Sequence, residues 1–235
     1  MNTIDNLKDK VLILDFDHTC YDTDDFLFAE IRQPMLNNFK IPVDIWEKSY
    51  RNAANIGYSL EQHREEIIKI ASSSPCSLSD IQELDKNINF SKYLYPEVIT
   101  VLKKVKDMGY RIMILSFGQI DWQNKKVFGS GIDKFVDKVE YVTADENKSK
   151  ADSIREYALG PYEVIFVDNK GSNLDMVISE LPYVTTYHIN RVPNDAMYFG
   201  DDENIRIKYL ESRMIAEAKT KFNHKQCSSL EEIIY

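Results

Sequence analysis

The sequence predicts an α/β fold in which a doubly wound parallel sheet is interrupted by an inserted all-helical domain. Four short apolar runs lack polar alternation, which is typical of parallel strands that are covered on both faces. Amphipathic segments with helical spacing lie between and after the later runs. The stretch 24–90, by contrast, carries only helical signals, so it is expected to form a separate unit after the first strand.

The expected strands and helices of the sheet domain alternate along the chain. The apolar runs that we interpret as strands are 11–14, 111–115, 164–167 and 184–189. The helices expected around them are 96–108, 119–128, 150–158 and 172–181. Gly109 is suited to end the first of these helices. A surface helix is expected over 203–221, and the final residues CSSLEEIIY are expected to return a short element to the core.

Capping signals and one proline divide the insert into helices. Ser59 precedes Gln62 at the spacing of a capping box, and an amphipathic segment follows. Ser79 with Gln82 is interpreted as the start of another helix. Pro34 is expected at a kink or break in the first helix of the insert, because proline removes a backbone donor.

The insert is expected to form a small cap domain over the sheet domain. Three aromatic residues of the insert, Trp46, Tyr50 and Tyr58, are interpreted as packing residues rather than as substrate contacts. The expected division is a core domain made of residues 1–20 and 93–235, with a helical cap domain of residues 21–92.

Composition and charge exclude several classes of protein. Hydrophobic residues make up 43% of the 235 residues, and no apolar run approaches the ~20 residues of a membrane span. A net charge of −9 disfavours binding to a nucleic-acid backbone. Three separated cysteines and an N-terminus without an apolar signal core favour a cytoplasmic location. We expect no membrane or nucleic-acid partner, and a monomer or homodimer.

Polar residues follow three of the expected strands at the point where each strand ends. Asp15 and Asp17 follow the first strand, Ser116 follows the second, and Asp168 follows the third. In open α/β sheets the ligand site lies beyond the carboxyl ends of the strands, so these side chains are expected to converge. Carboxylates crowded in one pocket favour a bound cation, and oxygen ligands without histidine or cysteine favour Mg²⁺.

The residue types at these positions suit nucleophilic and acid–base chemistry. Of two carboxylates separated by one residue, one can act as nucleophile and the other as general acid and base. The hydroxyl group of Ser116 can bind a phosphoryl oxygen, and a nearby lysine can neutralise its charge. Lys148 and Lys150 are the candidates for this lysine. Lys150 is preferred, because Ser149 is suited to cap a helix that begins there.

Four ordered motifs resemble the haloacid dehalogenase superfamily of aspartyl phosphatases. They are DFDHT before the helical insert, ILSFG, a lysine at a helix start, and VIFVDNKGSN. The resemblance implies a Rossmann-like core with a helical cap of the C1 type. It further implies an Mg²⁺-dependent phosphatase that hydrolyses a small phosphorylated metabolite through an aspartyl-phosphate intermediate. A phosphomutase of the same superfamily is the nearest alternative, and a non-catalytic member that binds a phosphorylated ligand or a protein is another.

The resemblance implies a role for each residue that matches a motif. Asp15 would be the nucleophile, Asp17 the general acid and base, and Lys150 the neutralising cation. Substrate-binding roles fall to Thr19, which would support the loop, and to Ser116, Phe117 and Gly118. Metal ligands would be Asp15, the backbone carbonyl of Asp17, Asp168 and Asn169.

The last motif departs from the pattern of the superfamily. A second acid often follows there, whereas this chain has Asn169 directly after the aspartate and Asn173 further along. Either asparagine could complete the metal site, and one negative charge fewer would weaken metal binding. Asp175 is expected to lie too far along the helix. A dehalogenase is disfavoured, because that chemistry resembles an aspartate nucleophile without the second aspartate, and Asp17 is present here.

Overall fold

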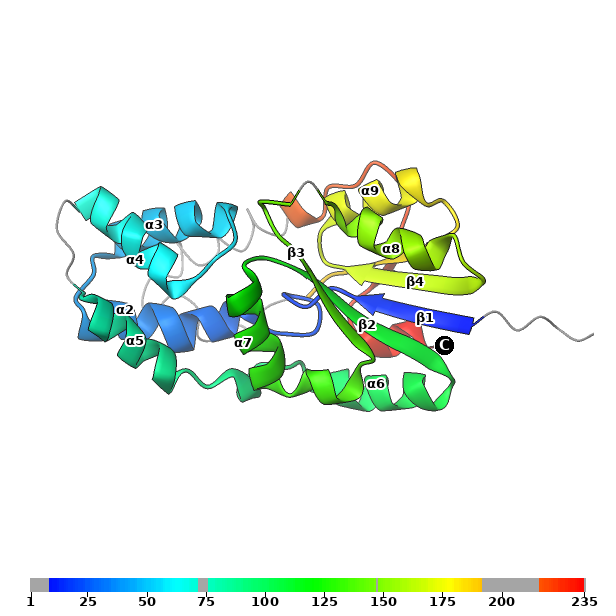
Figure 1. The fold of residues 1–235 in the computed structure, drawn as a ribbon, viewed down its shortest axis with the longest axis horizontal. Helices are drawn as coiled ribbons and strands as arrows, with labels where there is room; N and C mark the ends of the chain where they lie inside the picture. The colour runs from blue at the N-terminus through cyan, green and yellow to red at the C-terminus, as the bar shows by residue number, and fades with distance from the viewer. Residues whose placement is uncertain (1–8, 72–75, 147, 192–215, 235) are drawn as a thin grey trace, which may run out of the picture.

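A computed structural model describes residues 9–71, 76–146, 148–191 and 216–234. Its centre is a six-stranded sheet in which every neighbouring pair is parallel (Figure 1). The strands are β1 (Asp9–Leu14), β2 (Tyr110–Phe117), β3 (Lys138–Val142), β4 (Tyr162–Asp168), β5 (Thr185–Ile189) and β6 (Lys225–Cys227). Their spatial order is β3-β2-β1-β4-β5-β6, so the chain order reverses between β1 and β4. The predicted doubly wound parallel sheet is confirmed.

Helices cover both faces of this sheet. The helices α6 (Val98–Asp107) and α7 (Ile120–Ser130) lie on one face, and α8 (Lys150–Ala158) and α9 (Gly171–Glu180) lie on the other. Successive residues of β1 alternate between the two layers, with Leu12 and Leu14 in one hydrophobic cluster and Val11 and Ile13 in the other. Burial on both faces explains why the central strands are continuous apolar runs.

Two strands at opposite edges of the sheet were not predicted. β3 carries Lys138 and Glu140, whose charged side chains pair with each other at 2.8 Å at the sheet edge. β6 has only three residues, so it offers little pattern. Most of the helix expected over 203–221 lies outside the described residues. The closing element was predicted correctly, since the 3₁₀ turn Leu230–Ile233 buries its first and last side chains.

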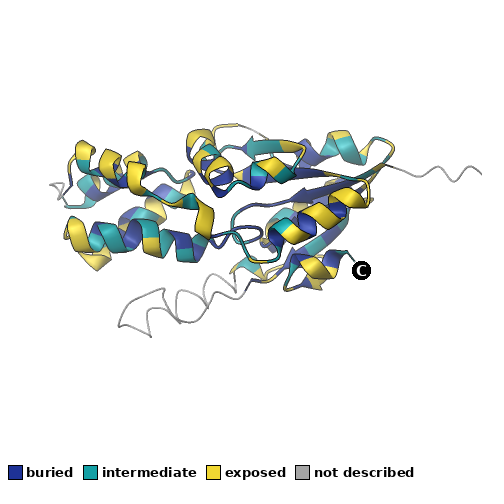
Figure 2. Ribbon diagram, turned by 90° about the horizontal axis from the view of Figure 1, so that it is seen from below, coloured by how far each residue is buried: buried dark blue, intermediate teal, exposed yellow. Residues whose placement is uncertain are grey.

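The segment between β1 and β2 is helical, as predicted, and extends from one end of the sheet (Figure 1). Its elements are α1 (Thr23–Phe26), a π-helical segment (Leu27–Arg32), α2 (Gln33–Asn38), α3 (Val43–Asn55), α4 (Leu60–Ala71), α5 (Leu78–Asn87) and a 3₁₀ turn (Phe90–Lys92). Buried positions run continuously from this cap into the core domain (Figure 2). One hydrophobic cluster therefore joins both domains.

Two local expectations for the cap differ from the structure in detail. The first helical run is not broken at Pro34, but it changes directly before that residue from a π-helical turn to α2, with the Gln33 amide donating to the Phe28 carbonyl. The helix α5 is capped by Ser77 with Asp80, rather than by Ser79 with Gln82. Of the capping box predicted at Ser59, the first hydrogen bond is confirmed, since the Ser59 hydroxyl accepts from the Gln62 amide at 3.2 Å.

The two segments that connect the core and the cap lie side by side. The Asp22 amide donates to the Tyr93 carbonyl at 2.7 Å. The Tyr95 amide donates to the Cys20 carbonyl at 3.1 Å. These contacts lie at the expected ends of the cap, 21–92, and join the two connections into a short paired ribbon.

A buried arginine fixes this ribbon to the sheet domain. The Arg191 guanidinium donates to the Thr19 carbonyl from Nε at 3.2 Å and from Nη2 at 3.0 Å. The same group pairs with Glu97 at 2.6 Å, donates to the Ser228 carbonyl at 3.1 Å, and lies over the Tyr95 ring at 4.1 Å. Arg191 thereby connects the loop after β1, the connection to the cap and the C-terminal segment.

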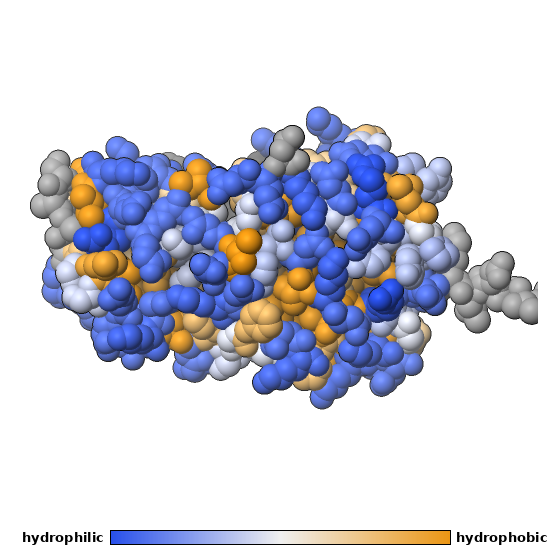
Figure 3. All heavy atoms as spheres, viewed as in Figure 1, coloured by the Kyte–Doolittle hydropathy of each residue, from blue (hydrophilic) through white to orange (hydrophobic). Residues whose placement is uncertain are grey.

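Hydrophilic side chains cover most of the molecular face shown in Figure 3. Among the described residues, no helix combines the length and the apolar character needed to cross a lipid bilayer.

The packing of α9 on the sheet gives a stability prediction. Leu174 is completely buried between the helix and the strands, so Leu174→Ala should lower the free energy of unfolding by about 2–5 kcal/mol. Leu159 is 71% exposed, and Leu159→Ala is the matched control, expected within about 0.5 kcal/mol of the original protein. Urea denaturation measures both. Equal losses for the two variants would contradict this arrangement of the core.

Candidate active site

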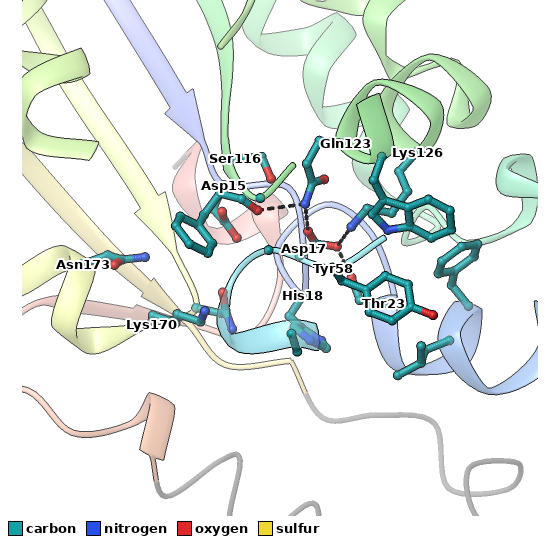
Figure 4. Close-up of a pocket in the computed structure, with 18 of the residues that line it drawn as sticks. Asp15, Asp17, His18, Thr23, Tyr58, Ser116, Gln123, Lys126, Lys170 and Asn173 are labelled. Carbon is teal, nitrogen blue, oxygen red and sulfur yellow. Dashed lines mark hydrogen bonds and ion pairs between the residues drawn. The ribbon is translucent and has the colours of Figure 1, made fainter. Parts of the chain in front are cut away.

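A cavity of about 210 Å³ lies beyond the carboxyl ends of β1 and β2, at the side of the sheet that the cap faces (Figure 4). This is the point where the strand order reverses, and ligands of open α/β sheets bind at such a point. Most of the residues predicted for the site line the cavity: Asp15, Asp17, Ser116, Phe117, Gly118, Lys150, Asn169 and Asn173. Thr19 and Asp168 lie behind its wall and contact the lining residues from there.

Asp15 is the first residue after β1 and is 5% exposed. Its amide donates to the Val167 carbonyl at 2.9 Å, which fixes the backbone against β4. Its carboxylate is in contact with the Lys150 ammonium and accepts a hydrogen bond from the Thr19 hydroxyl at 3.3 Å. Burial raises the pKa of Asp15 to about 7, although Lys150 acts in the opposite direction. Thr19 therefore contacts Asp15 directly, and its substrate-binding role stays a prediction.

Lys150 is the site lysine, and Lys148 is not. Ser149 caps α8 with Asp152 in a capping box, so Lys150 stands at the first position of the helix and reaches the ends of β1 and β4. Its ammonium contacts Asp15 and donates to Asp168 Oδ2 at 2.7 Å. Lys148 pairs instead with Glu140 at the sheet edge, at 2.6 Å.

Asp168 is fully buried, and both of its oxygens are engaged by protein donors. Oδ1 accepts from the Lys170 amide at 2.7 Å, and Oδ2 accepts from Lys150 and from Asn173 Nδ2 at 2.9 Å. The carboxylate thus positions Lys150, while its role as a metal ligand stays a prediction. Asp175 turns away from the cavity and pairs with His224 at 3.0 Å, as its place along α9 suggested.

Three residues that hold Asp17 were missed by the sequence analysis. Lys126, on α7, is 3% exposed and forms an ion pair with Asp17 Oδ1. Thr23 donates to the same oxygen at 2.6 Å, and Gln123 Nε2 donates to Oδ2 at 3.1 Å (Figure 4). Burial raises the pKa of Asp17, but the charge and hydrogen bond of Lys126, with that of Thr23, lower it to about 2.

A sequence signal for Lys126 existed but was not specific. Gln123 and Lys126 are three residues apart, so they share one face of the helix that begins after the Ser116 loop. The sequence analysis did not single out Lys126. Lys125 and Lys126 are adjacent and chemically identical, and only the structure tells which of them is buried.

The end of β2 and the residue after it contribute a free hydroxyl group, at Ser116, and a backbone position close to Gln123, at Gly118. Ser116 is completely buried, and its Oγ has no hydrogen-bond partner among the described residues. Pairing with β3 continues as far as Gly118, whose amide donates to the Val142 carbonyl at 3.0 Å, and its substrate-binding role stays a prediction. Gly118 also provides space, since a Cβ there would lie 2.6 Å from Gln123 Nε2.

The donor set is compatible with Mg²⁺. Within the described ranges no group of three His, Cys, Asp or Glu side chains is arranged to hold a metal ion. Mg²⁺, however, is usually held by one or two carboxylates together with water and substrate phosphate. Asp15 offers a carboxylate, and the buried side chain of Asn169, which also lines the cavity, offers an amide oxygen. Three carboxylates face two buried lysines here, so one negative charge remains for a cation to balance.

The fold is shared with solved structures of low sequence identity. A protein from Burkholderia xenovorans LB400, assigned as a haloacid dehalogenase-like hydrolase, is 18% identical with a TM-score of 0.67, covering 96% of this chain and 95% of that one. The L-2-haloacid dehalogenase of Xanthobacter autotrophicus, with chloropropionic acid covalently bound, is 16% identical with a TM-score of 0.64, covering 96% of each chain. A predicted phosphoglycolate phosphatase from Haemophilus somnus 129PT is 14% identical with a TM-score of 0.57, covering 97% of each chain.

No curated protein matches this chain. The profile of the haloacid dehalogenase-like hydrolases, in contrast, matches residues 12–170, which include Asp15, Ser116, Lys150 and Asp168. The match spans more than half of the chain and runs through β1, the cap and the ends of β2 and β4. The protein therefore belongs to the haloacid dehalogenase-like hydrolase family.

Proposed function

We propose that this hydrolase is a phosphatase that removes the phosphoryl group from a small phosphomonoester through an aspartyl-phosphate at Asp15. The observation that carries the proposal is the buried Ser116 hydroxyl, which has no partner within the described ranges and lines the same cavity as Asp15 and Lys150. Buried polar groups are nearly always hydrogen-bonded, so an unsatisfied hydroxyl beside a carboxylate and an ammonium group suits a ligand oxygen. A phosphoryl group supplies such oxygens.

In the first step, a carboxylate oxygen of Asp15 attacks phosphorus, and the bond to the leaving oxygen breaks. The leaving oxygen must then receive a proton. Asp17 alone holds no proton at neutral pH, because Lys126 and Thr23 keep its pKa low. The Lys126 ammonium group, which is paired with Asp17, does carry protons. The ion pair therefore supplies one proton to the leaving oxygen.

In the second step, water attacks the aspartyl-phosphate and gives its proton back to the Asp17–Lys126 pair. Inorganic phosphate leaves, and Asp15 is restored. Lys150 balances the charge of Asp15 throughout, and the Ser116 hydroxyl donates to a phosphoryl oxygen. Mg²⁺, held by Asp15, Asn169 and the Asp17 carbonyl, would add positive charge where the phosphate dianion approaches the nucleophile.

The test is phosphate release from p-nitrophenyl phosphate with and without Mg²⁺. We expect release that depends on Mg²⁺ and that falls below detection in Asp15→Asn, because the amide is not a nucleophile. Thermal unfolding of the variant controls for folding. Asp107→Asn is the matched control, since Asp107 is an exposed residue at the end of α6 and does not line the cavity, and it should retain activity.

Other products would contradict the proposal. Transfer of the phosphoryl group to another hydroxyl of a sugar phosphate, without free phosphate, would indicate a phosphomutase. Release of chloride from 2-chloropropionate, without phosphatase activity, would indicate a dehalogenase. No turnover on a broad panel of phosphomonoesters at high Mg²⁺ would favour a non-catalytic binding protein.

The two adjacent lysines of α7 provide a test of the proton source. Lys126→Met should lower kcat by about 10²-fold, because Asp17 loses the group that orients it and shares its proton. Lys125→Met, which removes only the partly exposed pair with Asp85, should leave kcat unchanged. Steady-state kinetics on p-nitrophenyl phosphate measures both variants. Similar kcat values for the two would remove Lys126 from the mechanism.

The two lysines around Ser149 test the charge balance in the same way. Lys150→Met leaves Asp15 and Asp168 buried without their cation, so kcat should fall by about 10²–10³-fold. Lys148→Met loses a partly exposed contact with Glu140 and should keep its activity. A Lys150→Met variant that folds and keeps the original kcat would contradict the assignment.

A further inference from the structure

The walls of the cavity are divided by charge. All charged side chains among its described lining residues belong to the core domain, whereas the cap contributes none. The part of the wall facing the charged half includes Leu27, Tyr50, Ala54 and Tyr58 of the cap, with Trp122 of α7. These side chains surround the space that the leaving group of a phosphomonoester would fill.

From this division we infer that the substrate is a phosphomonoester of a compact, uncharged alcohol that carries a single ring. The inference rests on the proposed phosphatase function, and it names the class of alcohol that the cap accepts. It excludes a leaving group with a carboxylate, and it excludes a polyhydroxylated sugar.

The size of the cavity indicates how much of the alcohol it can enclose. A closed apolar cavity of roughly 150 Å³ is enough to hold benzene. The cavity here measures about 210 Å³, and the phosphoryl group must occupy its charged end beside Asp15 and Ser116. The remaining enclosed space suits one ring.

The cap keeps its polar groups away from the cavity. The Ser49 hydroxyl donates its proton to the Trp46 carbonyl at 3.0 Å, so His63 Nε2 must be the donor in its 3.0 Å contact with Ser49. His63 is neutral, because burial lowers its pKa to about 4, and its Nδ1 therefore accepts from the Tyr58 hydroxyl at 3.0 Å. In Figure 4 the Tyr58 hydroxyl points away from Asp17.

The aromatic wall is held together by contacts between its own rings. The Tyr58 ring meets Trp122 edge-on, with centroids 5.4 Å apart, and lies 5.5 Å from the Tyr50 ring. Phe26 lies behind them, 6.2 Å from Trp122. Such rings favour another ring at a similar distance by offset or edge contacts.

A charged or hydroxyl-rich leaving group that packed against the cap side of the cavity would lose its hydration there without compensation. Burying a polar group that finds no partner is costly, and burying an unpaired charge costs more. The two buried cations of the cavity, Lys126 and Lys150, are already paired with Asp17 and Asp15. Lys170, another cation of the lining, is exposed.

The test compares three alkyl phosphates, so that leaving-group reactivity does not decide the result. They are benzyl phosphate, 2-phosphoglycolate and glucose 6-phosphate. With Mg²⁺ present, kcat/KM for benzyl phosphate should exceed both others by at least tenfold. A higher kcat/KM for 2-phosphoglycolate or for glucose 6-phosphate would overturn the inference while leaving the phosphatase function intact.

A charge placed in the apolar wall tests the same inference by gain of function. Ala54→Lys should lower kcat/KM for benzyl phosphate and raise it for 2-phosphoglycolate, so that their ratio falls by at least tenfold. Asn55→Lys, on the adjacent exposed position of α3, is the matched control and should leave the ratio unchanged. An unchanged ratio in Ala54→Lys would show that the leaving group does not contact the cap.

Binding without turnover separates the two hypotheses. Calorimetry of Asp15→Asn with benzyl phosphate and with 2-phosphoglycolate does not depend on catalysis. Tighter binding of benzyl phosphate by at least tenfold, in a protein whose original form releases no phosphate, would support the ligand class and reject the phosphatase function. Equal binding, or none, would overturn the inference.

Discussion

The contact of one ammonium group with two buried carboxylates underlies the whole site. Lys150 lies between Asp15 and Asp168 and thereby joins the start of α8 to the ends of β1 and β4. Each of these charges would be costly to bury alone, and removal of one partner from a buried ion pair typically costs about 3–5 kcal/mol. The three groups are therefore stable only together, and the parallel order of the strands determines that they meet.

A second charge pair gives the site its asymmetry. Lys126 reaches Asp17 from α7, on the opposite face of the sheet from α8. The two aspartates of the first motif thus belong to different local environments although one residue separates them. Asp15 is enclosed and close to Asp168, whereas Asp17 is partly exposed and held by Lys126 and Thr23. Different environments allow identical side chains to serve as nucleophile and as part of an acid–base pair.

The sequence predicted those features that depend on local pattern. The continuous apolar runs predicted the central strands, and Ser149 predicted the helix start that places Lys150. It could not predict features that depend on packing between distant segments. The alternation in β3 is that of a half-exposed edge strand, and the burial of Lys126 rather than Lys125 depends on how α7 rotates against the sheet. Likewise, the hydrogen bond from the Gly118 amide to the Val142 carbonyl forms because β3 extends as far as Val142.

The paired ribbon between the domains has a mechanical consequence. Two connections that are hydrogen-bonded to each other twist and bend as one strip, so the cap can rotate about a single axis instead of moving freely as on a tether. Arg191 holds the Thr19 carbonyl on the sheet side of that axis. On the opposite side of the cavity, the Gln119 amide group donates to Gln62 of the cap at 2.8 Å. The ribbon and this contact therefore hold the cap at two places, so the distance between the cap side of the cavity and Asp15 is set from both.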